Sequence, residues 1–372
     1  MTNFFKGFFG GKKESVIGID IGTSAIKVVQ ISRKGQKVVL DTYGALALGP
    51  YVDMEIGRAT NLSVEKTVEA LGDVLKEANI TTRQCGIAIP FASSLMTVIE
   101  MPDVSVEQLV GMIPIEARKY IPVPISEVML DWSVIPSDEY TATGKETTDV
   151  SKTTETVKKK KDVLIVAIHK EMVAKYQDIV KKTDLNASFF EIELFSTMRS
   201  VLEQENVPVG VLDMGAASTK LYVIERGAVR VSHTVNRGSQ DVTLAISKSL
   251  GIPVNQAEVI KRDPNLGGHS DDKGVLEAVS LVTDHIFSEA SRVFFSYQKK
   301  HQKNISKIIL VGGGIALAGL TDKARKALKI EVEKGDPFSK VEAPAFLDEV
   351  LKKVGPEFAV AVGVALRRLQ EV

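Results

Sequence analysis

The fold is decided by the stretch VIGIDIGTS at residues 16–24. Its first part is apolar and β-branched, which predicts a buried strand, and Gly22 predicts a tight turn into a second strand over residues 25–32. A glycine turn lets backbone N–H groups converge on phosphate oxygens, and the hydroxyls of Thr23 and Ser24 add further donors. The stretch therefore predicts a strand–turn–strand loop that binds phosphate.

Two charged side chains flank this loop. Asp20 ends the first strand and is placed to hold a hydrated magnesium ion, because Mg²⁺ keeps several waters and takes few carboxylates. Lys27 lies in the second strand and adds positive charge beside the phosphate. The loop thus predicts a site for a magnesium–polyphosphate complex.

The same layout returns at residues 209–219, with the sequence VGVLDMGAAST. A strand again ends in an aspartate, Asp213, followed by Gly215, the hydroxyl residues Ser218 and Thr219, and another strand. One such turn is weak evidence, because Asp-x-Gly joins many hairpins for structural reasons alone. Its repetition with the same flanking strands predicts two duplicated lobes that clamp a polyphosphate, with Asp213 as the second magnesium-binding carboxylate.

A third motif, IILVGGGIALAGL, occupies residues 308–320. It predicts a buried strand ending in Gly312, Gly313 and Gly314, where a flat nucleoside can lie against the backbone next to the start of a helix. Gly-x-Gly-x-x-Gly is only partly met, and no Walker A sequence occurs. The motif therefore predicts a nucleoside site outside the Rossmann and P-loop classes.

Two Asp-x-Gly loops followed by three glycines resemble the actin, Hsp70, sugar kinase and FtsA superfamily. Within it the chain is similar to the type IV pilus assembly protein PilM family, through GIDIGTSAIK at 18–27, YIPVP at 120–124 with LDW at 130–132, and AEVIK at 257–261. The resemblance covers nearly the whole chain. It implies an α/β, actin-like ATPase fold, in which each of two lobes has a mixed sheet flanked by helices and a small subdomain of the FtsA and PilM type is inserted.

A chain of 372 residues suits two lobes. The expected boundaries are residues 15–50 and 186–208 for the first lobe, rejoined by 355–372, residues 51–185 for the small subdomain, and residues 209–354 for the second lobe. Inside the small subdomain, residues 138–162 are rich in Thr, Ser, Glu and Lys, which predicts a mobile surface loop with little to bury.

Further site residues follow from the resemblance alone. Glu258 and Lys261 lie three apart and share a helix face, and the family implies that this helix, with Arg262, contacts ribose and base. Without the family the pair would be interpreted as a surface ion pair. Glu193 matches the family's first connecting segment, where it could orient the attacking water or equally cap a helix.

One segment departs from the family pattern. Residues 236–238 read Asn-Arg-Gly where the family has paired glycines. Gly238 is assigned to the nucleotide wall, and Arg237 either alters the shape of that wall or adds a phosphate or ribose contact.

Composition excludes several classes of protein. Lys plus Arg and Asp plus Glu number 47 each, so no net positive field favours nucleic acid. A lone cysteine, Cys85, rules out disulfides, fits a reducing compartment and predicts an inert core thiol. The chain shows no apolar run long enough to span a membrane and no signal peptide. We therefore expect a cytoplasmic protein without a membrane-spanning helix.

The N-terminal segment, residues 1–14, stands apart from this pattern. It carries four phenylalanines, at positions 4, 5, 8 and 9, followed by Lys12 and Lys13. Such a segment either touches a membrane surface, folds back onto the protein or stays loose.

The resemblance implies a scaffold of type IV pilus assembly. It would bind ATP or ADP with Mg²⁺, grip the cytoplasmic N-terminal peptide of the inner-membrane protein PilN, and lie peripherally at the inner face of that membrane. Hydrolysis could be slow or absent, because binding alone shifts a lobe equilibrium; self-association stays open.

The alternative is an FtsA-like, filament-forming division protein. Because the chain ends at residues 369–372 with LQEV, we expect it to lack the basic linker and terminal amphipathic helix of that class. A small-molecule kinase is disfavoured, because no catalytic base stands out beside an acceptor pocket.

Overall fold

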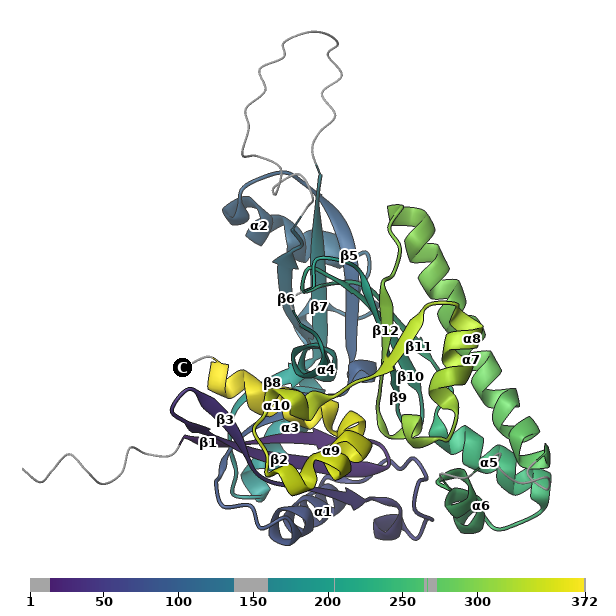
Figure 1. The fold of residues 1–372 in the computed structure, drawn as a ribbon. Coiled ribbons are helices and arrows are strands. Elements are labelled where there is room, and N and C mark those ends of the chain that lie inside the picture. The colour runs from purple at the N-terminus through teal and green to yellow at the C-terminus, as the bar shows by residue number, and fades with distance from the viewer. Residues whose placement is uncertain (1–13, 137–159, 204, 264–265, 267–272, 371–372) are drawn as a thin grey trace, which may run out of the picture.

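Two lobes and a smaller subdomain make up the molecule (Figure 1). The computed structural model describes residues 14–136, 160–203, 205–263, 266 and 273–370. The expectations for the N-terminal segment 1–13 therefore lie outside the described residues.

The first lobe is built on a five-stranded sheet in the order β3-β2-β1-β4-β8. Its strands are β1 (Ser15–Ile21), β2 (Ala25–Lys34), β3 (Lys37–Ala47), β4 (Gln84–Ile89) and β8 (Asn186–Ile192). Side chains alternate along β1, so Ile17 and Ile19 pack with α1 (Val64–Glu77) and α3 (Lys170–Lys182). Val16 faces the other side of the sheet, under α10 (Ala359–Gln370).

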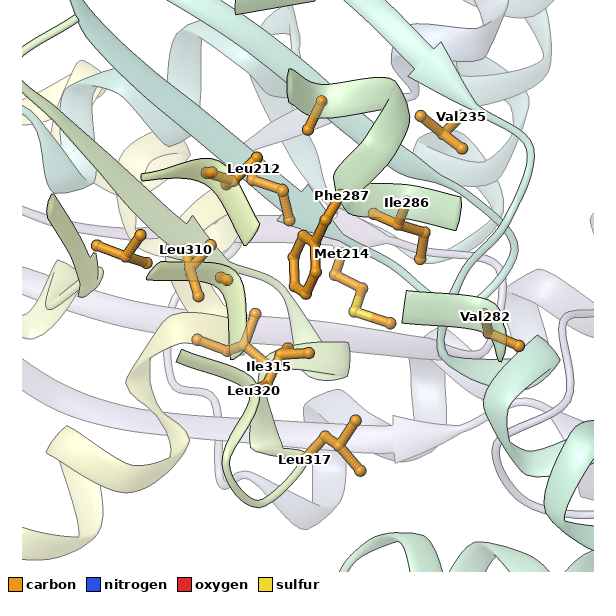
Figure 2. Packing of buried hydrophobic residues seen from close by; sticks show 14 of the residues in the cluster. Leu212, Met214, Val235, Val282, Ile286, Phe287, Leu310, Ile315, Leu317 and Leu320 are labelled. Carbon is orange, nitrogen blue, oxygen red and sulfur yellow. The ribbon is translucent and has the colours of Figure 1, made fainter. Parts of the chain in front are cut away.

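The second lobe repeats this sheet in the order β11-β10-β9-β12-β13. Its strands are β9 (Val209–Met214), β10 (Thr219–Glu225), β11 (Ala228–Val235), β12 (Lys307–Val311) and β13 (Glu331–Lys334). The helices are α5 (Ser239–Leu250), α6 (Val254–Lys261), α7 (Lys273–His301) and α8 (Leu320–Leu328). The following helix, α9 (Asp348–Val354), packs through Leu351 in the cluster between the first sheet and α10. Figure 2 shows the core between sheet and helices, where Leu212 and Met214 of β9 meet Ile286 and Phe287 of α7.

The two sheets share one connectivity. In each, an antiparallel hairpin (β1–β2 and β9–β10) is joined on its first strand by a parallel strand that comes later in the chain (β4 and β12). The predicted duplication of the α/β lobes is confirmed by this topology.

The small subdomain is narrower than the sequence suggested. It comprises a three-stranded sheet in the order β5-β7-β6 with α2 (Val106–Ala117), over residues 94–169, and stands apart from the first sheet in Figure 1. Its strands are β5 (Ser94–Pro102), β6 (Val128–Val134) and β7 (Lys160–His169). The expected span 51–185 was too wide, because β4 is a central strand of the first sheet and α1 and α3 cover that sheet.

The surface loop expected over residues 138–162 falls mostly outside the described residues. Its last three residues belong instead to β7, where Lys160 forms an ion pair with Glu100 at 2.7 Å. The prediction was wrong for these residues, because strand pairing with β5 continues to the Pro102–Lys160 pair.

The lobes are linked by α4 (Glu193–Val201) and α10. These helices touch at backbone distance, since a Cβ on Gly363 would lie 1.8 Å from the carbonyl oxygen of Ser196. Beside the crossing, Arg199 donates to both oxygens of buried Glu191 at 2.7 Å. The close contact between the two helices therefore requires glycine at position 363.

Two expectations from composition can be compared with the described residues. Cys85 lies fully buried in β4, and burial raises the pKa of its thiol to about 12, which makes it unreactive. Across the described part of the chain, no helix is long and apolar enough to cross a membrane.

Candidate nucleotide site

A cavity of about 480 Å³ lies between the two lobes, at the turns of the β1–β2 and β9–β10 hairpins. Every predicted site residue except Thr219 and Gly238 lines it. The lining residues among those predicted are Asp20, Gly22, Thr23, Ser24, Lys27, Glu193, Asp213, Gly215, Ser218, Glu258, Lys261, Arg262, Gly312, Gly313 and Gly314. A volume of this size is typical of small-molecule sites.

The two predicted phosphate loops have the same geometry. In the first, the Gly22 N–H donates to the Ala25 carbonyl at 3.1 Å, and in the second the Gly215 N–H donates to the Ser218 carbonyl at 3.0 Å. Each turn follows an aspartate that is buried at the end of its strand: Asp20 is 8 % exposed and Asp213 is 5 % exposed. The duplicated loops therefore face one cavity with matching carboxylates.

Thr219 and Gly238 support the second loop from outside the cavity. The Thr219 hydroxyl is fully buried and donates to the Arg237 carbonyl at 2.8 Å, so it cannot serve a phosphate as predicted. Gly238 is the N-cap of α5, and a Cβ there would lie 2.3 Å from the Ala216 carbonyl oxygen. The Thr219 hydroxyl is thus directed away from the cavity, against the prediction, whereas the place of Gly238 in the nucleotide wall stays a prediction.

The Arg237 side chain lies outside the cavity lining. Its guanidinium lies 3.7 Å from the Asp241 carboxylate, its side chain is 55 % exposed, and it is absent from the described cavity lining. The two roles considered for Arg237 stay predictions.

The three glycines approach the second loop closely. Gly312 has φ of 91°, and a Cβ there would lie 2.5 Å from the Asp213 Oδ1 atom and 2.6 Å from the Met214 carbonyl oxygen. A short 3₁₀ turn, η6 (Gly313–Ala316), follows, and α8 begins only at Leu320. The helix N-terminus expected here is instead that of α5, whose Ser239 lines the cavity beside the second loop.

Glu258 and Lys261 form a nearly buried ion pair in the cavity wall. Their charged atoms lie 2.6 Å apart, with Arg262 on the other carboxylate oxygen at 2.7 Å and the Thr243 hydroxyl donating at 2.7 Å. Burial acts to raise the pKa of Glu258, but Lys261, Thr243 and Arg262 outweigh it, so the pKa falls below its usual 4.5. The surface ion pair considered from sequence alone is excluded.

Glu193 lies at the base of the cleft and is 7 % exposed. It accepts the Phe91 N–H at 2.6 Å on one oxygen and the Lys220 ammonium at 2.9 Å on the other. Burial raises the pKa of the Glu193 carboxyl, and Lys220 opposes that shift. Glu193 does not cap its own helix, so this alternative is excluded.

Sequence reasoning missed Lys220, which the spacing could have revealed. Lys220 follows Asp213 by seven residues, as Lys27 follows Asp20, and each lysine lies opposite its aspartate in the hairpin register. The ammonium groups lie 3.5 Å from Asp20 and 3.6 Å from Asp213. Each loop therefore carries one aspartate–lysine pair.

A loop of the first lobe reaches across the outer edge of the cavity. The Ala59 N–H donates to the Gln240 side chain of α5 at 3.1 Å, and Gly57, with φ of 90°, lies against Glu258. No local sequence pattern predicts these contacts, because they join segments that are far apart in the chain.

The residues present fit a magnesium–nucleotide complex. Two carboxylates, Asp20 and Asp213, suit a hydrated Mg²⁺, and the two lysines and the hydroxyl groups of both turns suit phosphates. The Thr197 hydroxyl is buried at the same cavity and has no hydrogen-bond partner among the described residues, which leaves a donor for a bound group.

Known proteins share this architecture. A solved structure titled "PilM-PilN type IV pilus biogenesis complex" matches with a TM-score of 0.78 and 23% identity, covering 96% of this chain and 99% of that chain. The ethanolamine utilization protein EutJ from Carboxydothermus hydrogenoformans matches with a TM-score of 0.56 and 15% identity, over 95% and 90% of the two chains. MreB5 of Spiroplasma citri bound to AMPPNP matches with a TM-score of 0.50 and 11% identity, over 97% and 98%.

Curated relatives include the cell division protein FtsA of Neisseria meningitidis serogroup B. It is 24% identical over 93% of this chain and 88% of its own length. FtsA of Pseudomonas aeruginosa is 20% identical over 96% and 89%.

The duplicated lobes and their likeness to these structures define an actin-like ATPase fold. A model of the family described as type IV pilus assembly protein PilM matches residues 18–369. The chain belongs to this family and is a PilM-type pilus assembly protein.

Proposed function

We propose that the chain is an ATP-binding scaffold that holds the cytoplasmic N-terminal peptide of a PilN-like inner-membrane protein during type IV pilus assembly. The observation that carries the nucleotide part is the pair of matching aspartate–lysine loops facing one cavity of about 480 Å³. ATP or ADP bound there, with Mg²⁺ near Asp20 and Asp213, would be held by both lobes at once. Occupancy of the cleft then favours the closed arrangement of the lobes.

Individual residues take distinct parts in this proposal. The turns at Gly22 and Gly215 cradle the phosphates, Gly312 to Gly314 admit the nucleoside, and Glu258, Lys261 and Arg262 form the ribose and base wall. Glu193 is the candidate for orienting water. Its two oxygens hold Lys220 and the Phe91 N–H. Slow or absent hydrolysis is sufficient for this function, because binding alone shifts the equilibrium between lobe arrangements.

The partner part of the proposal is supported by the likeness to the PilM–PilN complex. We place the peptide contact on the small subdomain, where Val106 and Val110 lie one turn apart on α2 and are 58 % and 57 % exposed. Exposed apolar groups gathered on one element are typical of interaction surfaces. Binding the tail of a membrane protein would hold the scaffold peripherally at the inner face of the membrane, in the cytoplasm.

Calorimetry with a synthetic N-terminal peptide of the PilN-like partner tests this function, with and without Mg-ATP. Val110→Glu places a charge on the proposed contact surface and should weaken peptide binding by about tenfold, roughly 1.4 kcal/mol. Leu281→Glu is the matched control: Leu281 is 76 % exposed on α7 of the second lobe and should leave binding unchanged. If Val110→Glu and Leu281→Glu bind the peptide with equal affinity, the peptide does not bind on α2.

The FtsA relatives favour a second candidate, an ATP-dependent filament at the membrane. Sedimentation with lipid vesicles separates the two functions. ATP-driven sedimentation of the protein without any peptide affinity would support the filament and oppose the scaffold.

A further inference from the structure

The two lysines of the phosphate loops differ in one contact. Among the described residues, Lys27 forms an ion pair with Asp20 alone, whereas Lys220 lies 3.6 Å from Asp213 and 2.9 Å from Glu193. Glu193 begins α4, the helix between the lobes, so the Lys220–Glu193 contact joins the second loop to the hinge region. Burial acts to lower the pKa of Lys220, but Glu193 and Asp213 outweigh it, so the pKa lies above its usual value and the ammonium stays charged.

Glu193 also contacts the segment that leads into the small subdomain. Its second oxygen accepts the N–H of Phe91 at 2.6 Å. Phe91 opens the 3₁₀ turn η2 (Phe91–Ser93), directly before β5, the first strand of the small subdomain. One carboxylate therefore bridges a lysine in the nucleotide cavity and the backbone from which the small subdomain departs.

We propose that Lys220 is a phosphate-binding residue selective for the triphosphate, and that Glu193 is a positioning residue through which Lys220 reports phosphate occupancy to the small subdomain. This inference rests on the proposed nucleotide function. ATP brings one more phosphate group than ADP between the two loops, and that group competes with Glu193 for the Lys220 ammonium. A buried carboxylate deprived of its counter-ion, and facing Asp213 and phosphate, is repelled and loosens its hydrogen bond to Phe91.

Nucleotide affinities and hydrogen exchange measured together test the proposal. In the unaltered protein, Mg-ATP should raise exchange in residues 91–102 more than Mg-ADP does. Lys220→Met should weaken ATP binding by about tenfold and ADP binding by less than about threefold. In this variant, hydrogen exchange in residues 91–102 should be the same with Mg-ATP as with Mg-ADP. Lys27→Met is the matched control and should weaken both nucleotides without removing the exchange response to ATP.

Glu193→Gln tests the second half, because glutamine keeps a hydrogen-bond acceptor but no longer competes as an anion. It should bind ATP several-fold more tightly and show the same exchange in residues 91–102 with and without ATP. Lys220→Met combined with Glu193→Gln leaves one buried carboxylate, Asp213, without its lysine instead of two. It should show the ATP-affinity loss if the single variant does not fold.

Equal weakening of ATP and ADP by Lys220→Met, or a full exchange response in Glu193→Gln, would overturn the proposal while the nucleotide function stands. If the unaltered protein binds neither nucleotide, the proposed function fails and this inference fails with it.

Discussion

The two lobes carry one strand–turn–strand motif in different surroundings. The first loop is braced by the segment after β3, where the N–H groups of Leu48 and Thr60 donate to the carbonyls of Ser24 and Thr23 at 2.9 and 2.8 Å. The second loop is braced by the N-terminus of α5, where Ser239 donates to the Gly215 carbonyl at 2.9 Å. A helix N-terminus therefore adds positive potential only to the second loop. The comparison teaches that duplication preserved the loop geometry while the supporting elements diverged.

The lobes differ most sharply two residues before each aspartate. The first lobe has Gly18, where a Cβ would lie 1.9 Å from the Ala361 carbonyl oxygen and 2.7 Å from the Ala365 nitrogen. The second lobe has Val211 at the same place, packed in an apolar cluster with Tyr222 and Ile309. Only the first sheet is pressed against a helix backbone, that of α10.

Gly18→Ala should have the largest effect on the fold. Because the clashing atoms are backbone, they cannot turn away, and we expect the free energy of unfolding to fall by more than about 3 kcal/mol. Urea denaturation measures it. The control Gly72→Ala lies on α1 with nothing near the added methyl and should raise stability by about 0.5–1 kcal/mol. A Gly18→Ala variant as stable as the unaltered protein would contradict the backbone contact between β1 and α10.

Loss of the loop aspartates should have the next largest effect. Asp20→Asn and Asp213→Asn each remove a candidate magnesium carboxylate, and we expect each to weaken Mg-ATP binding by about a hundredfold, roughly 2.7 kcal/mol. Calorimetry with and without magnesium measures it, and Asp184→Asn, at an exposed carboxylate, is the control. If only one aspartate matters, the duplication of the loops does not extend to the metal.

Much of this could be predicted from the sequence, where the signal is local. The strands and turns of both loops follow from a few adjacent residues, and the spacing of Glu258 and Lys261 correctly placed them on one helix face.

The rest depends on contacts between distant segments. The boundaries of the small subdomain were wrong because β4 inserts between β1 and β8, a pairing that no local pattern records. Thr219 resembles a phosphate ligand in the sequence, but in the structure its hydroxyl donates to the carbonyl of Arg237, in the segment that follows β11. Lys220 had a signal in its spacing, but its contact with Glu193 arises only when α4 and β10 meet.

The smallest predicted effect concerns the Glu258–Lys261 ion pair on α6, which contrasts with an ion pair of the same spacing on α1 of the first lobe. Glu258 and Lys261 are nearly buried, whereas Lys66 and Glu69 on α1 have the same spacing, lie 2.8 Å apart and are about half exposed. Buried charge-assisted hydrogen bonds contribute more than exposed pairs, which salt and water screen. At neutral pH, Glu258→Gln should therefore cost about 1.5 kcal/mol of stability and Glu69→Gln less than about 0.5 kcal/mol.

The pH dependence of that cost distinguishes a charge effect from a packing effect. The folded-state pKa of Glu258 lies below its usual 4.5, so its stabilisation is fully present above that pH and is lost as the pH falls through the lower, folded value. Urea midpoints measured from neutral pH downward should show the unaltered protein and Glu258→Gln converging in acid. A stability difference that persists below the folded-state pKa of Glu258 would mean that glutamine destabilises the protein through its packing. The electrostatic contrast between the lobes would then be wrong.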